Sequence, residues 1–431
     1  MNIFVTQFCL NGCKYCFAKL FMMGQKYLTR KNAWLFLWFL IKNTIKRRAV
    51  LPELNIMGGE PFLYKDLGWF LRLLNRFRIV KQITVFTGGN VPTENLKMLD
   101  KKCHVCLNLN ERKDYKQSQD WDLITKNLAT LIDEMHIRVA LSYNIYSLDF
   151  NGEEIIDIAQ KFGIEHIRIA IASPIYNHVG YTQLVHPKDY RELAPKVFDF
   201  VKACNSKGIK VNLDCRVPYC FFTKEQIGWF VQNDQHITGG IKTCLCGGPI
   251  CISPDLMVSK CTVFSEIEEP LSKFSSIDDI FDFIYHSVDS RFGIPDLYDH
   301  CKICEHNTYC SGGCPAWKEN FHNNPDEVEQ NNEVMVLMQK NIELYQKQGN
   351  DIPEFRENER TILEKVKYLP RRPDPLMYYL LSQYYCSTDR KEEALRYSRL
   401  SINANGMASF NWKIKTGFLP CFSVNKIQLG F

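Results

Sequence analysis

Over the first half of the chain, short apolar runs alternate with longer segments whose apolar residues recur at helical spacing. The runs rich in Val and Ile predict strands at Ile3–Phe8, Glu53–Met57, Gln82–Thr87, Val105–Leu109, Ile137–Tyr143, His166–Ala172 and Val211–Asp214. The helical patterns cover Lys31–Lys46, Leu67–Arg76, Thr125–Met135, Glu153–Phe162 and Tyr190–Asn205. About six such repeats predict an α/β fold with a partial (β/α)6 barrel, whose ligands bind at the carboxyl ends of the strands.

The pattern changes further along the chain. From about Gly239 to Asn324, Gly, Pro and Cys dominate, and the long helical pattern there is Ile277–Ser287. Metal sites rather than a large apolar core are expected to hold this part together. Helical patterns then return at Val328–Gln348, Glu354–Lys367, Leu376–Tyr385 and Lys391–Asn403. We predict a barrel over 1–215, a cysteine-rich domain over 216–325, and a helical extension over 326–431 whose last pair resembles a tetratricopeptide hairpin.

Composition and charge restrict the class of protein. With 45% hydrophobic and 23% charged residues, the chain is typical of globular rather than disordered proteins. Its formal charge is only +5, and Lys46-Arg47-Arg48 is the basic run that stands out, so no nucleic-acid partner is expected. The N-terminus lacks the features of a signal peptide. The longest apolar run, Ala33–Ile41, predicts a buried amphipathic helix rather than a membrane span. We therefore expect a cytoplasmic protein with no membrane partner.

The 18 cysteines are the strongest chemical signal. In a reducing compartment, clustered thiols are more often metal ligands than disulfides. Cys9, Cys13 and Cys16 form C-x3-C-x2-C directly after the first predicted strand. Three thiolates on one loop can hold three corners of a cubane cluster and leave the fourth iron open, although a zinc loop or a chance spacing is the alternative.

The second predicted strand ends in Gly58-Gly59-Glu60-Pro61. Adjacent glycines let the backbone approach a ligand closely, and the carboxylate can face an ammonium group. Together with the cysteine loop, this segment resembles the radical S-adenosylmethionine (SAM) superfamily over about residues 1–215. The resemblance implies a [4Fe–4S] cluster on the three cysteines, SAM chelated to its open iron, and reductive cleavage to a 5′-deoxyadenosyl radical. It also implies that Tyr15 lies beside the adenine and that Gly58, Gly59 and Glu60 contact the amino group of SAM.

Polar residues also end the later strands. Thr87, Asn108, Ser142 and Asn144 are predicted to contact the ribose of SAM, with turn formation as the alternative for each. Arg168 lies inside a strand, where a structural ion pair is favoured over a ligand-binding role. Cys103 and Cys106, three apart in a strand, point to opposite faces and are predicted to be core residues.

The downstream cysteines have the most specific spacing in the chain, Cys301-x2-Cys304-x5-Cys310-x3-Cys314. Alone they suit tetrahedral zinc. Taken with the N-terminal half they resemble the SPASM extension of radical SAM enzymes, which holds one or two auxiliary [4Fe–4S] clusters. The resemblance implies that Cys261, Cys314, Cys246 and Cys244 belong to the first auxiliary cluster. It assigns Cys301, Cys304 and Cys310 to the second.

Two positions depart from that pattern. Leu256 stands where the family usually has Gly, which suggests a modified hairpin. After Cys314 the next cysteine is Cys386, too far along to match the last ligand of the pattern. The second cluster is therefore expected to use a distant, a different or an absent ligand, and the candidates are His322, Cys386, Cys421, Cys220 and Cys251.

The resemblance implies a substrate that is oxidised or crosslinked through a radical. Thr262 follows Cys261 where sulfatase-modifying members usually carry an acidic base, so that activity is disfavoured. The chain begins eight residues before Cys9, which suggests that it lacks an N-terminal peptide-recognition domain. The hypotheses are a peptide-modifying enzyme, a dehydrogenase or cofactor-biosynthesis enzyme acting on a small molecule, and a non-catalytic zinc protein. A peptide or small protein, and a flavodoxin or ferredoxin electron donor, are the expected partners.

Overall fold

The computed structural model describes residues 1–16, 18, 26–115, 118–175, 183–237, 249–289, 325–349, 352–367 and 387–404, with single residues or pairs between 301 and 317 and between 381 and 385. Cys244, Cys246, His322, Cys386 and Cys421 lie outside the described residues. Contacts divide the chain into two compact units, one with most of residues 1–319 and one with residues 320–431. The predicted boundaries at 215 and 325 remain predictions.

The first unit is built on one ten-stranded sheet in the order β10-β9-β8-β1-β2-β3-β4-β5-β6-β7. Neighbouring strands from β1 to β7 are parallel. They span β1 (Asn2–Thr6), β2 (Leu51–Gly58), β3 (Val80–Thr87), β4 (Cys103–Asn108), β5 (Arg138–Ile145), β6 (His166–Ile171) and β7 (Lys210–Leu213). The order has two ends, so the sheet is open, and the predicted α/β partial barrel is confirmed.

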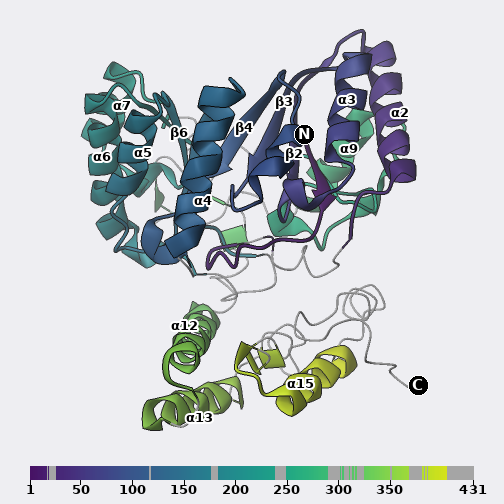
Figure 1. Cartoon of the computed structure of the whole chain (residues 1–431). Coiled ribbons are helices and arrows are strands. Elements are labelled where there is room, and N and C mark those ends of the chain that lie inside the picture. The colour runs from purple at the N-terminus through teal and green to yellow at the C-terminus, as the bar shows by residue number, and fades with distance from the viewer. Residues whose placement is uncertain are drawn as a thin grey trace. The chain divides into compact units, whose positions relative to one another are not determined.

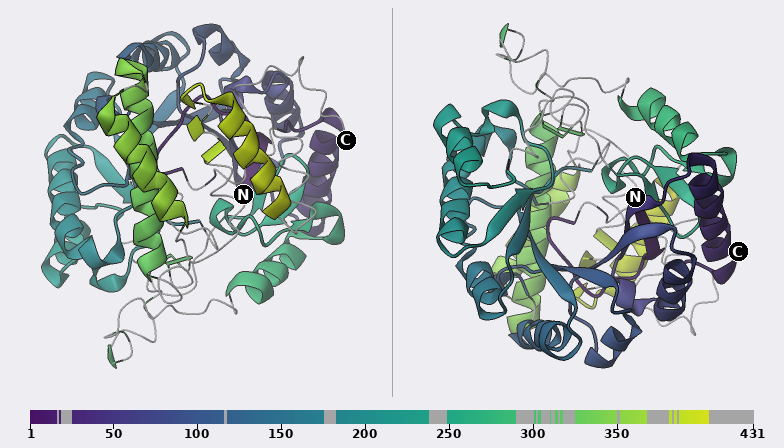
Figure 2. Two further views of the ribbon diagram at one scale, coloured as in Figure 1. Left: turned by 90° about the horizontal axis from the view of Figure 1, so that it is seen from below. Right: turned by 90° about the horizontal axis from the view of Figure 1, so that it is seen from above.

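Helices lie along the outer face of this curved sheet (Figure 1, Figure 2). They are α2 (Arg30–Arg47), α3 (Leu67–Phe77), α4 (Ser118–Ala129), α5 (Glu153–Lys161) and α6 (Tyr190–Ser206). The Thr29 side chain caps α2 by accepting from the Asn32 N–H at 3.1 Å. Each helix returns the chain to the same edge of the sheet, so the residues that follow β1 to β7 gather at their carboxyl ends.

Helix α2 only partly matches the expected buried helix. Its inner face is buried through Phe36, Leu37 and Leu40. Trp34 and Trp38 on its other side are about half exposed, at 47% and 54%. The apolar run therefore continues around the helix, and Trp34 makes an edge contact with Trp69. Among the described residues, no helix has the length and apolar character needed to cross a membrane.

Helix α7 (Lys224–Gln232) was not predicted from the apolar pattern. A capping box marks its start, because the Thr223 side chain accepts from the Gln226 N–H while the Gln226 side chain accepts from the Thr223 N–H. The T-x-x-Q sequence was the available signal, since it satisfies two of the backbone donors that open a helix.

The cysteine-rich segment extends the sheet beyond β1. Strand β8 (Cys251–Ile252) is parallel to β1, and β9 (Met257–Ser259) and β10 (Glu269–Pro270) follow as antiparallel neighbours. Leu256, in the β8–β9 turn, has φ 61°, the left-handed conformation that favours glycine. The turn therefore has the backbone conformation of a glycine, and holding a leucine in it costs about 1–2 kcal/mol of conformational free energy.

Helix α9 (Ile277–Ile284) is tied to α2 by one buried side chain. Asn43 accepts from the Ile277 N–H at 2.8 Å and donates to the Phe39 carbonyl at 2.9 Å. The Ile277 N–H belongs to the first turn of α9, where backbone donors lack partners within the helix. Asn43 therefore joins the cysteine-rich segment to the barrel.

We expect Asn43→Ala to lower the free energy of unfolding by about 1–3 kcal/mol, because the Ile277 N–H loses its acceptor in a buried place. Urea denaturation of the full chain measures this. Ile45→Ala, on the exposed side of α2, is the matched control and should change the same quantity by less than about 0.5 kcal/mol. Equal stabilities of the two variants would contradict the assigned link.

The second unit contains α12 (Pro325–Gln348), α13 (Pro353–Lys367) and α15 (Lys391–Ala404). Buried Asn341 of α12 donates to the Phe355 carbonyl of α13 at 2.9 Å and to the Tyr384 hydroxyl at 3.0 Å. Leu381 and Ala394 are buried, as a packed helical hairpin requires. The likeness to a tetratricopeptide hairpin remains a prediction.

Candidate functional site

The C-x3-C-x2-C loop follows β1 directly, at the carboxyl edge of the sheet. The Cys16 N–H donates to the Cys13 carbonyl at 3.2 Å, which closes the loop on itself. Burial raises the pKa of the Cys9 thiol well above its usual range, and the charges of Cys13, Cys16 and Glu60 add to the shift.

These thiols suit an iron–sulfur cluster by their chemistry, since three soft sulfur donors on one loop are the ligands such clusters take. Within the described part of the chain, no three Cys, His, Asp or Glu side chains already stand in a metal-binding arrangement. Cluster binding would deprotonate the thiols, since the thiolate is the form that ligates a metal.

The two glycines at the end of β2 lie against the start of this loop. A Cβ atom on Gly59 would lie 2.1 Å from the Phe8 carbonyl oxygen and 2.7 Å from the Cys9 Cβ. The Gly59 N–H donates to the Thr6 carbonyl at 3.0 Å, and the Glu60 N–H to the Phe8 carbonyl at 2.7 Å. The glycines thus permit a close backbone contact between the two motifs. A direct contact of Gly58 and Gly59 with SAM remains a prediction.

The Glu60 side chain is buried and links the ends of β2 and β3. Its Oε1 accepts from the Phe62 N–H at 3.2 Å and from the Thr87 hydroxyl at 2.8 Å. Its Oε2 accepts from the Gly88 N–H at 2.9 Å. Burial raises the pKa of this carboxyl group to about 7, and the hydrogen bonds oppose that rise. The Thr87 hydroxyl, predicted to face SAM, is engaged with Glu60 and also accepts from the Gly89 N–H.

Tyr15 belongs to a chain of polar side chains that crosses the sheet edge. Its hydroxyl donates to the Asn110 Oδ1 at 2.6 Å and accepts from the Asn108 Nδ2 at 2.7 Å. The Asn144 Nδ2 donates in turn to the Asn108 Oδ1 at 2.5 Å. The Asn110 Nδ2 also lies 3.9 Å from the Cys13 sulfur. The structure therefore joins three of the predicted SAM contacts to the cysteine loop.

Ser142 is placed differently. Its hydroxyl accepts from the Arg168 Nη1 at 2.6 Å, and Arg168 also forms an ion pair with Asp214. The structural ion pair predicted for Arg168 is confirmed. The Ser142 hydroxyl is thus used inside the sheet, and its role toward the ribose remains a prediction.

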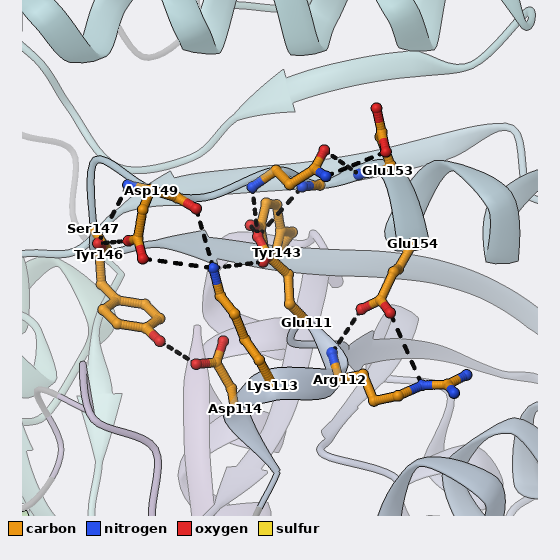
Figure 3. Close-up of polar contacts among 12 residues, drawn as sticks. Glu111, Arg112, Lys113, Asp114, Tyr143, Tyr146, Ser147, Asp149, Glu153 and Glu154 are labelled. Carbon is orange, nitrogen blue, oxygen red and sulfur yellow. Dashed lines mark hydrogen bonds and ion pairs between the residues drawn. The ribbon is translucent and has the colours of Figure 1, made fainter. Parts of the chain in front are cut away.

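A second polar cluster lies beyond β4 and β5, and the sequence interpretation did not single it out (Figure 3). Glu111 accepts from the Tyr143 hydroxyl and from the Asn151 N–H, and pairs with Lys113 at 3.0 Å. Asp114 accepts from the Tyr146 hydroxyl, whose ring lies 5.4 Å from that of Tyr15. The run Glu111 to Asp114 directly after a strand was the available signal. This cluster fixes the loops beside Tyr15.

The cysteine-rich segment contains two neighbourhoods of thiols. Cys261 and Cys314 pack against one buried apolar cluster that includes Phe264 and Ala316. Burial raises the pKa of the Cys215 and Cys251 thiols, and Cys261 adds to both shifts. Burial also raises the pKa of the Cys220 thiol, to which Cys310, Cys301 and Cys304 contribute. Cys103 and Cys106 are buried in β4, as predicted for core residues.

These features define an open (β/α) barrel with a candidate site at the carboxyl ends of its strands. No protein family model matches the chain. The GTP 3′,8-cyclase of Campylobacter jejuni subsp. doylei is 25% identical over 191 residues, 43% of this chain and 58% of that protein. That of C. jejuni subsp. jejuni is 23% identical over 192 residues. The chain thus spans somewhat more than half the length of these relatives.

Solved structures share the fold. Native anSMEcpe with bound AdoMet matches with a TM-score of 0.51 and 16% identity, over 76% of this chain and 97% of that one. Streptococcus suis SuiB bound to S-adenosylmethionine matches with a TM-score of 0.51 and 15% identity, over 73% and 72%. The chain is thus similar in fold to these two AdoMet-bound proteins, and its cysteine loop and Gly-Gly-Glu-Pro segment resemble those of the radical SAM superfamily. SAM and an iron–sulfur cluster are the cofactors of that superfamily.

Proposed function

We propose that this protein reductively cleaves SAM and uses the resulting radical to oxidise or crosslink a peptide. Cys9, Cys13 and Cys16 would hold the [4Fe–4S] cluster. When bound, the cluster supplies the electron that splits SAM into methionine and a 5′-deoxyadenosyl radical. This radical would take one hydrogen atom from the substrate and so become 5′-deoxyadenosine, leaving a radical on the substrate.

The observation that carries this proposal is the direct joining of the Gly-Gly-Glu-Pro segment to the cysteine loop. The Glu60 N–H donates to the carbonyl of Phe8, the residue before Cys9. This hydrogen bond holds the backbone that carries the Glu60 carboxyl beside the backbone that carries the Cys9 thiol. The donors to Glu60 are the neutral groups of Phe62, Thr87 and Gly88. An ammonium group such as that of SAM would stabilise the buried carboxylate.

The polar chain through Tyr15 supports the same site. Asn108 and Asn144, at the ends of β4 and β5, fix the Tyr15 hydroxyl, and Asn110 links it to Cys13. We propose that these hydrogen-bonded side chains orient the cysteine loop and present their remaining amide groups to the ribose of SAM. Its members come from separate strands, so the site depends on the correct register of the sheet.

Two solved structures with a similar fold support a peptide substrate. The structure of anSMEcpe with the Cp18Cys peptide matches this chain with a TM-score of 0.52, and that of SuiB with the precursor peptide SuiA matches it with a TM-score of 0.51. A cysteine-rich segment with two neighbourhoods of thiols suits auxiliary clusters that accept an electron from a substrate radical. The second candidate, chemistry on a small molecule, is favoured by the sequence likeness to GTP 3′,8-cyclase.

We propose a flavodoxin or a ferredoxin as the electron donor, since cluster reduction needs a one-electron carrier. We also propose the cytoplasm as the location. The 18 cysteines support this, because a reducing compartment keeps such thiols available as ligands.

The test uses the full chain, reconstituted anaerobically with iron and sulfide and supplied with SAM and dithionite. We expect 5′-deoxyadenosine, and with short peptides encoded beside the gene we expect a peptide that has lost two hydrogens by mass spectrometry. Product formed with GTP but with no peptide would favour the second candidate. Tightly bound zinc with no charge-transfer absorption would contradict both.

A further inference from the structure

The second auxiliary site lacks one ligand in the sequence. Cys301, Cys304 and Cys310 offer three thiols, and after Cys314 the next cysteine is Cys386. Four-cysteine ligation is the common arrangement for iron–sulfur cubanes. The structure brings a short turn that carries a fourth thiol into contact with Cys310, from a distant part of the sequence.

That thiol belongs to Cys220, in the short 3-10 turn Tyr219–Phe221 between β7 and α7. The Tyr219 N–H donates to the Cys310 sulfur at 3.3 Å, so the residue next to Cys220 already contacts one member of the trio.

Two further contacts hold this turn against the cysteine loop. A Cβ atom on Gly313, between Cys310 and Cys314, would lie 3.2 Å from the Pro218 Cδ, so the two backbones run side by side. Tyr190 of α6 bridges the same segments, with its ring 5.0 Å from that of Phe221 and 6.2 Å from that of Trp317. The placement of Cys220 thus rests on packing on both sides of the turn, all within the first compact unit.

The other spare cysteines near this site belong to a different neighbourhood. Cys251 is buried in β8, where it accepts from the Asn2 Nδ2 at 3.6 Å, and it interacts with Cys261. Among these spare cysteines, Cys220 is the one whose neighbouring backbone N–H contacts a member of the trio.

We propose that Cys220 is the fourth thiolate ligand of the second auxiliary cluster, together with Cys301, Cys304 and Cys310. The Tyr219 N–H then donates to a ligand sulfur, a bond of the kind that tunes the potential of a cluster. The inference rests on the iron–sulfur part of the proposed function and is independent of the substrate.

The test compares variants of the full chain after anaerobic reconstitution, by iron and sulfide per chain and by electron paramagnetic resonance. Cys220→Ala should lose the iron of one cluster, or keep it in an oxidised three-iron form with its own signal, to the same extent as Cys301→Ala. Cys204→Ala, a buried cysteine of α6, is the matched control and should keep full iron. Cys220→His keeps a metal-binding side chain and should hold the iron with a shifted signal.

Circular dichroism of the apo forms separates ligand loss from misfolding, since all four variants should match the original chain. Wild-type iron and an unchanged signal in Cys220→Ala would overturn the proposal, and loss of one cluster from His322→Ala, Cys386→Ala or Cys421→Ala would then identify the actual ligand. If no 5′-deoxyadenosine forms while iron still falls in Cys220→Ala, the proposed function fails and the ligand assignment stands.

Discussion

Replacing Cys9, Cys13 and Cys16 together with alanine is expected to reduce 5′-deoxyadenosine release to the level without enzyme. These residues offer the three thiols of the loop that follows β1. Without them the open iron that SAM needs has no support. Chromatography of the nucleoside after incubation with SAM and dithionite measures the effect. The iron content should fall by one cluster while the auxiliary iron remains.

Cys103→Ala is the matched control for this variant. Cys103 is equally a thiol of the barrel, but it is buried in β4 and takes part in the core. Its loss should cost only packing free energy and leave nucleoside release close to that of the original chain. Release that survived the triple replacement would show that SAM is cleaved elsewhere, and the site assignment would be wrong.

The barrel could be predicted because its signals are local. Each strand from β1 to β7 is a short apolar run, and each helix between them carries its own apolar periodicity. The cysteine loop and the Gly-Gly-Glu-Pro segment are local too, because their function depends on spacing within a few residues. Helix α7 was not predicted, because its sequence signal is a capping box rather than a periodic apolar face.

The partners of the site residues could not be predicted in the same way. Glu60 bonds Thr87, Tyr15 bonds Asn108 and Asn110, and each pair is far apart in sequence. The sequence interpretation predicted SAM contacts for Glu60, Tyr15, Thr87 and Asn108, with turn formation as the alternative for the last two. In the structure several of these side chains form hydrogen bonds with one another, because buried polar groups need partners within the protein when no ligand is bound.

The sequence could not single out a fourth ligand for the second auxiliary cluster, for a related reason. Cys220 lies 81 positions before Cys301, and no spacing rule connects them. What connects them is the 3-10 turn after β7, whose backbone meets both Cys310 and Gly313. Distances of this kind follow from topology, which sequence patterns define only after the sheet order is known.

Gly59→Ala is expected to lower SAM cleavage about 100-fold, although the added group is a single methyl. Its Cβ would lie 2.1 Å from the Phe8 carbonyl oxygen, and the opposing atom is backbone that cannot rotate away. The start of the cysteine loop must therefore move by a distance comparable to 1 Å, a misplacement that costs about that factor at a reacting centre.

Gly228→Ala separates this effect from a general cost of losing glycine. Gly228 lies inside α7 with no atom within 4 Å of its added Cβ. Alanine there should stabilise the helix by about 0.5–1 kcal/mol and leave cleavage unchanged. If Gly59→Ala kept full activity, the Gly59–Phe8 contact would not position Cys9, and the glycines would serve only to admit SAM. If instead SAM cleavage fell while circular dichroism showed a folded protein, the close contact between Gly59 and Phe8 would be needed to position the cysteine loop for SAM cleavage.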